Sequence, residues 1–71
     1  MSSLQRRLLD ELVQGQARSA EELGQAIGCS YYSVVMCILG CKRQGWVKRG
    51  EAVESYMITE AGLRVRHRNN S

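Results

Sequence analysis

The sequence has no proline, no low-complexity tract and no stretch typical of a linker between domains. It also lacks any apolar run near the roughly 18 to 20 residues that are needed to cross a bilayer. The first residues, which include Arg6 and Arg7, are not followed by the apolar segment of a signal peptide. We therefore expect residues 1–71 to form a single cytoplasmic domain that has no membrane partner.

Signatures of catalysis are absent as well. The sequence contains no nucleophile elbow, phosphate-binding loop or metal-hydrolase motif. His67 is the single histidine and lies in a basic tail, so we interpret it as a solvated residue rather than a catalytic base or ligand. Adjacent acids such as Glu21 and Glu22 point about 100° apart on a helix and cannot converge on one substrate. We expect no enzymatic activity, and no small-molecule ligand is evident.

Cysteine is scarce: the sequence has three cysteines, an odd number, and shows no export signal. Both features argue for reduced thiols rather than a disulfide framework. Cys37 and Cys41 are four residues apart and could share a metal with Cys29 or His67. The same helical spacing places both thiols on an apolar stripe beside Val34, where a free cysteine acts as a small hydrophobe. We therefore favour buried, slowly reacting thiols and expect no metal site and no cofactor.

Charge is distributed unevenly along the chain. Residues 1–28 carry three arginines against four acids, whereas residues 29–71 carry seven lysines and arginines against three acids. Basic surfaces attract phosphate, so the second part of the chain is the more promising place for contact with a polyanion. The cluster formed by Arg64, Arg66, His67 and Arg68 is either a backbone-binding tail or only a solubilising end.

Hydrophobic periodicity predicts four helices and a hairpin. The expected elements are helices at about residues 3–14, 20–27, 31–44 and 60–66, strands at about 46–49 and 55–59, and a frayed tail at 67–71. The expected caps are Ser2 with Gln5, Ser19 with Glu22, Ser30 and Thr59. The first helix should end near Gln14 and Gly15. A two-stranded hairpin is marginal alone, so it must pack on the helices through Trp46, Tyr56 or Ile58.

The second and third predicted helices carry the marks of a helix-turn-helix. Gly24 supplies a small residue where the two helices touch, Gly28 supplies a sharp turn, and Cys29 supplies an apolar residue within the turn. Apolar residues that would lock the angle between the helices are Leu23, Ile27, Val34 and Cys37. This arrangement would brace the second helix so that it can enter a groove.

The segment Ser-Tyr-Tyr-Ser-Val-Val-Met-Cys-Ile-Leu-Gly-Cys-Lys-Arg-Gln-Gly-Trp-Val-Lys-Arg, residues 30–49, resembles the MarR-type pattern of the winged-helix superfamily of small bacterial and phage DNA-binding regulators. The later Tyr-Met-Ile-Thr-Glu-Ala-Gly is similar to the second wing strand and the Thr-capped helix of that superfamily. The resemblance covers about residues 4–66. It implies an α+β, mainly α fold: a winged helix-turn-helix with three helices, a two-stranded β wing and a short C-terminal helix.

The resemblance also implies a transcriptional regulator that binds double-stranded DNA. The exposed face of the third helix would read the major groove, while basic residues of the wing would hold phosphates. The base-facing set is Tyr31, Tyr32, Ser33, Val35 and Met36, and the backbone set is Arg43, Lys48 and Arg49, with backbone N–H donors at Ser19 and Ser30. A monomer buries little contact area, so a homodimer or a larger protein partner is expected.

One feature departs from the family pattern. The third helix presents Val35, Met36 and Leu39 where regulators usually carry polar or basic residues, and no lysine or arginine lies between Ser30 and Gly40. Exposed apolar surface on a small domain commonly marks contact with another protein. The alternative is therefore a protein-docking winged helix, an adaptor or inhibitor, that uses this apolar face.

Overall fold

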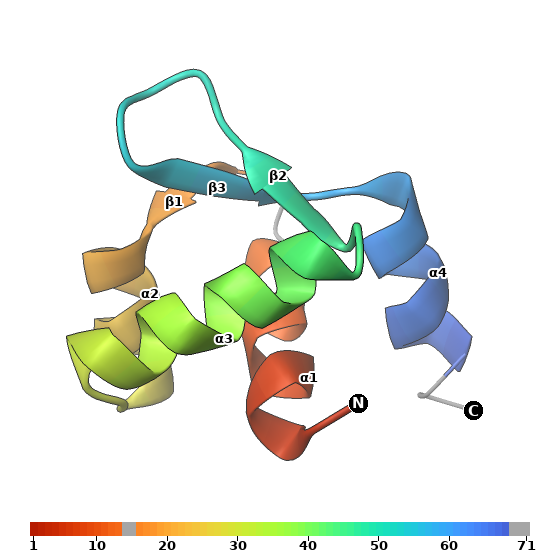
Figure 1. Ribbon diagram of the computed structural model, residues 1–71, viewed down its shortest axis with the longest axis horizontal. Helices are drawn as coiled ribbons and strands as arrows, with labels where there is room; N and C mark the ends of the chain where they lie inside the picture. Colours follow the sequence, from red (N-terminus) through yellow and green to blue (C-terminus); the bar gives the residue numbers. More distant parts are fainter. Residues whose placement is uncertain (14–15, 69–71) are drawn as a thin grey trace.

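The computed structural model describes residues 1–13 and 16–68. Its elements are α1 (Ser3–Leu12), β1 (Arg18–Ser19), α2 (Ala20–Ile27), α3 (Tyr31–Arg43), β2 (Val47–Arg49), β3 (Ser55–Ile58) and α4 (Glu60–Arg68). Figure 1 shows the small sheet on one side of the helices, with α3 crossing in front of α1 and α4 standing at the far end. The predicted winged helix-turn-helix, mainly helical with a β wing, is confirmed.

Side-chain caps begin the helices where the sequence placed them. Ser2 and Ser19 each form a complete capping box, with Gln5 and Glu22 respectively. The Ser30 hydroxyl accepts from the backbone N–H of Ser33 at 3.2 Å and starts α3. The Thr59 hydroxyl accepts from the N–H of Gly62 at 3.0 Å and starts α4. These bonds satisfy N–H groups that have no partner within the helix.

The sheet has three strands rather than the two that were predicted, in the order β1-β3-β2. The hairpin partners β2 and β3 pair Val47 with Ile58, and β1 adds an antiparallel edge by pairing Ser19 with Ser55. A two-residue strand has no periodicity, so the sequence pattern could not reveal it. Ser19 is both the last residue of β1 and the cap of α2, which joins the wing directly to the helix pair.

Several boundaries differ from the prediction. The helix α1 ends at Leu12 with Val13 as its cap, and the predicted end at Gln14 and Gly15 lies outside the described residues. The helix α3 ends at Arg43, one residue early, because Gln44 is its cap. The predicted strands lose Trp46 and Thr59, and α4 continues through residues 67–68, which were assigned to the tail. The rest of that tail, residues 69–71, also lies outside the described residues.

The core lies where α1, α2 and α3 meet under the sheet. Its fully buried side chains are Leu8, Leu9, Leu12, Leu23, Val34, Ile38 and Cys41. Trp46, Tyr56 and Ile58 pack against this core, which confirms how the hairpin is anchored. Among the described residues, no single helix is long and apolar enough to cross a membrane, and only the bent pair α2 and α3 reaches that length and composition together.

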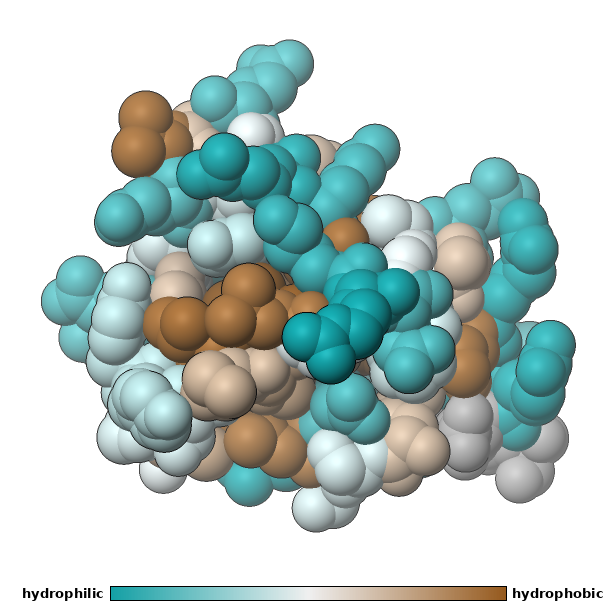
Figure 2. Space-filling view, viewed as in Figure 1, coloured by the Kyte–Doolittle hydropathy of each residue, from teal (hydrophilic) through white to brown (hydrophobic). Residues whose placement is uncertain are grey.

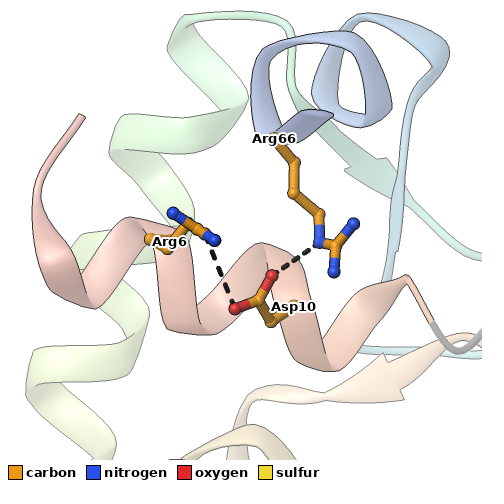
Figure 3. Close-up of polar contacts among 3 residues, drawn as sticks. All are labelled: Arg6, Asp10 and Arg66. Carbon is orange, nitrogen blue, oxygen red and sulfur yellow. Dashed lines mark hydrogen bonds and ion pairs between the residues drawn. The ribbon is translucent and has the colours of Figure 1, made fainter. Parts of the chain in front are cut away.

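Polar contacts fasten the outer helices. The guanidinium of Arg7 donates to the carbonyl of Ile27 and so satisfies an acceptor at the end of α2. The carboxylate of Asp10 on α1 accepts from Arg66 of α4 at 2.5 Å and lies 3.7 Å from the guanidinium of Arg6 (Figure 3). Asp10 therefore joins the first and last helices.

Candidate nucleic-acid interface

The helix pair α2 and α3 has helix-turn-helix geometry. The chain bends by 110° between the two helices, within the usual range for this motif. Gly28 adopts a left-handed φ of 83°, as the predicted turn requires. A Cβ atom on Gly24 would lie 3.1 Å from the Cys29 carbonyl oxygen, so a small residue is needed there. The predicted roles of both glycines are confirmed.

One face of α3 carries exposed side chains. Tyr31 and Tyr32 are both exposed, and Met36 and Leu39 are 51% and 49% exposed. Val35 differs from the expectation for a base-facing residue, because it is half-buried and packs against the core. In Figure 2 the exposed apolar surface appears as a band along the front of the molecule, bordered by hydrophilic side chains.

Cations border this face on two sides. Arg43 lies exposed in the last turn of α3, and Lys48 and Arg49 lie exposed on β2. None of the three forms an ion pair with another described residue. Charged groups that are not neutralised within the fold remain able to bind an external anion. Lys42, which the prediction omitted, lies beside Arg43 and is also exposed.

The two predicted N-terminal anion contacts differ in availability. The carboxylate of Glu22 accepts the Ser19 backbone N–H at 3.0 Å, and this hydrogen bond lowers the pKa of Glu22. Because that carboxylate already occupies the start of α2, a phosphate there would meet like charge. The first turn of α3 has no acidic residue. The geometry therefore favours Ser30 over Ser19 as an anion contact.

The wing tip carries a feature that the sequence analysis missed, because the predicted hairpin assigned no role to the residues between its two strands. Glu51, Val53 and Glu54 are exposed, and Val53 is 90% exposed. The Ser55 hydroxyl donates to the Ala52 carbonyl at 2.7 Å and closes the turn. The tip is thus acidic and apolar, whereas the strand leading to it is basic. Composition alone could have shown the two acids, but not the exposure of Val53.

The thiols of α3 face the interior, as predicted. Cys41 is fully buried and donates a hydrogen bond to Cys37. Burial raises the pKa of both thiols, and it raises that of Cys41 to about 12. Within the described parts of the chain, no three His, Cys, Asp or Glu side chains gather in a way that could hold a metal ion.

Comparison with known proteins gives similarity in structure alone. No protein-family model matches the sequence, and no curated protein matches it. The PcaV transcriptional regulator from Streptomyces coelicolor superposes with a TM-score of 0.89 and 20% identity, over 97% of this chain and 54% of PcaV. A MarR family protein from Bacillus stearothermophilus gives a TM-score of 0.85 and 19% identity, over 99% of this chain and 56% of that protein.

A viral domain is similar over nearly its whole length. ORF112-Zalpha of Cyprinid Herpesvirus3, in a structure of its binding to Z-DNA, gives a TM-score of 0.74 and 17% identity, over 83% of this chain and 98% of the viral one. The chain spans only about half the length of the two bacterial proteins. At these identities the likeness concerns the fold, and on that ground this chain has the winged-helix, MarR-like fold.

Proposed function

We propose that this chain is a DNA-binding winged helix that regulates transcription, with α3 in the major groove and β2 on the phosphate backbone. The observation that carries the proposal is the exposed face of α3, bordered by the cations Arg43, Lys48 and Arg49, which form no ion pair with another described residue. The structure of ORF112-Zalpha with Z-DNA supports DNA as a ligand for this fold. A cytoplasmic location and the lack of a small-molecule ligand stay predictions.

The side chains divide into two roles. Tyr31, Tyr32 and Met36 would reach base edges, because they are exposed on α3 and offer hydroxyls and an apolar tip. Ser33 and Val35 lie closer to the body of the domain and would contribute at the edge of this surface. The cations would neutralise phosphates, together with the backbone N–H groups after Ser30.

In the proposed binding mode, each copy of the chain contacts one half-site of the DNA. A single α3 reads only a few base pairs, and useful affinity for one operator commonly needs two half-sites. We therefore propose that the active species is a homodimer or a complex with a larger protein. The acids Glu51 and Glu54 would repel phosphates, so the backbone contact is assigned to the strand β2 rather than to the tip of the wing.

Salt dependence tests the proposal. Binding to a short random duplex, followed by fluorescence anisotropy, should weaken steeply between about 50 and 200 mM salt. Arg43→Ala and Arg49→Ala should each reduce the slope of log affinity against log salt by about one, because each removes one phosphate contact. Arg64→Ala is the matched control, since Arg64 lies on α4 and should leave the slope unchanged. Equal slopes for all four proteins would contradict the proposed interface.

A protein partner is the second candidate, favoured by the apolar character of the same face. A groove of about 380 Å³ runs beside it between the start of α1 and α3, and Leu4, Tyr32 and Met36 are among its lining residues. Under this alternative, Leu39→Asp should abolish retention of the partner in a pull-down, whereas Arg49→Ala should leave it nearly intact. The reverse pattern, with Arg49→Ala the more damaging change, would exclude the docking function.

A further inference from the structure

The outer face of α4 contains an open hollow in which one apolar side chain, Leu63, lies among charged residues that are mainly basic. The hollow measures about 470 Å³ and is lined by Glu60, Leu63, Arg64, His67 and Arg68. Leu63, the apolar residue of this lining, is 42% exposed. Arg64 lies 3.4 Å from Glu60, but both side chains are mainly exposed, so the pair is weak and can exchange for another acid. This face has no role in the proposed contact with DNA.

The wing tip has the complementary shape and charge. Val53 is almost fully exposed and stands between two exposed acids, Glu51 and Glu54. The turn is fixed by two hydrogen bonds of Ser55, from its hydroxyl and from its N–H to the carbonyl of Ala52 at 2.7 and 3.2 Å. An apolar side chain held in water by an ordered turn is well suited to cover the apolar residue of an open hollow.

The two surfaces cannot meet within one molecule. Figure 1 shows the loop between β2 and β3 and the helix α4 toward opposite ends of the longest axis, which measures 30 Å. An interface between two different patches of identical copies is heterologous and builds an open chain rather than a closed dimer. The charges also oppose a pairing of tip against tip, because it would bring the acids Glu51 and Glu54 of both copies together.

We propose that copies of this chain associate head to tail, with Val53 of one copy over Leu63 of the next and with Glu51 and Glu54 facing Arg64 and Arg68. This inference rests on the proposed function, because copies on DNA are where the contact acts. The tip of one loop buries less than the roughly 800 Å² per partner of a stable interface, so the contact is weak alone. DNA raises the effective concentration of neighbouring copies, and binding then becomes cooperative.

The direction of α3 fits such an assembly. In Figure 1, α3 runs across the front of the molecule from the side of the wing loop toward α4. Copies joined through the loop and α4 would therefore present their α3 helices in series. Helices in series can follow a groove continuously. The acidic wing tip, which is unsuited to a phosphate contact, would then serve as the contact between neighbouring copies.

Charge exchange tests the contact. A tip variant, Glu51→Lys with Glu54→Lys, and an α4 variant, Arg64→Glu with Arg68→Glu, should each lose self-association because like charges then meet. An equimolar mixture of the two variants should recover it, since the lysine tip of one then faces the acidic helix of the other. Val53→Ser should weaken association with all charges retained. Glu21→Lys, an exposed acid on α2, is the matched control and should behave as the unmodified protein.

Two readouts separate this inference from the proposed function. Sedimentation velocity over rising protein concentration at low salt measures the contact without DNA, and the Hill coefficient on a long duplex measures it on DNA. We expect a Hill coefficient above one that falls to one in each variant and rises again in the mixture. Circular dichroism shows whether each variant is folded. Recovery of association in the mixture is independent evidence that both charge variants are folded.

The outcomes are distinct. A protein that sediments as a monomer at every concentration and binds a long duplex with a Hill coefficient of one overturns the inference, while binding to a short duplex would leave the proposed function intact. A mixture that fails to recover association also overturns it. Association without any binding to DNA would instead uphold the contact and refute the proposed function.

Discussion

Replacing Gly62 by alanine should lower the free energy of unfolding by about 2 to 3 kcal/mol. Helix propensity alone points the other way, since alanine is favoured over glycine by about 1 kcal/mol inside a helix. At this position, however, a Cβ atom would lie 2.3 Å from the carbonyl oxygen of Trp46 and 2.7 Å from a side-chain carbon of Ile58. The Trp46 carbonyl also accepts the backbone N–H of Thr59 at 2.9 Å, so it cannot move aside without breaking that bond.

Gly40→Ala is the matched control for Gly62→Ala. It is also a helical glycine, but a Cβ there would meet only the flexible end of Gln5 at an ordinary 3.6 Å. Its expected effect is a gain of up to about 1 kcal/mol. In urea unfolding followed by circular dichroism, the midpoint urea concentration should therefore be lower for Gly62→Ala and higher for Gly40→Ala than for the unmodified protein. Equal midpoints for the two variants would show that α4 does not approach the backbone of Trp46 closely.

Alkaline pH should destabilise the fold through Cys41. Burial and the hydrogen bond to Cys37 raise the pKa of this thiol from 9.0 to about 12 in the folded protein. The unfolded chain therefore releases the proton first as pH rises. The stabilisation is fully present below pH 9.0 and is lost between pH 9.0 and about 12, at a limiting rate of about 1.4 kcal/mol for each pH unit.

The comparison of the unmodified protein with Cys41→Ala isolates this effect. The variant should be less stable at pH 8 because it leaves a small cavity. Its free energy of unfolding should then fall less steeply above pH 9.0, since no buried thiol is left at residue 41 to titrate. Urea unfolding at several pH values measures both slopes. Parallel slopes in the two proteins would mean that Cys41 does not govern the alkaline limit.

Local signals predicted most of the fold. Capping at Ser2, Ser19 and Ser30 depends on hydrogen bonds within three residues, so the sequence contains all the required information. The strand β1 could not be predicted, because two residues form a strand only when β3 is placed beside them by the rest of the fold. Likewise, no local pattern reveals the ion pair that ties α4 to α1, because Asp10 lies 56 positions away from its partner Arg66.

The candidate interface was predicted less completely. Helical periodicity of about 100° for each residue separates the buried and exposed faces of α3, but it leaves Val35 at their border, where packing decides. The close approach of Gly62 to Trp46 is invisible in a pattern of single residues. The exposure of Val53 depends on how the turn at Ser55 closes, and that required the folded geometry.

The shared role of Ser19, which ends β1 and begins α2, has a consequence for the choice of DNA sequence. The sheet and the helix pair are joined through this residue without a linker, so the separation between α3 and β2 is set by the fold. In the proposed binding mode, a duplex whose groove width does not match that separation must itself deform. The cost depends on the stiffness of its base steps, so base pairs that no side chain touches would still influence affinity.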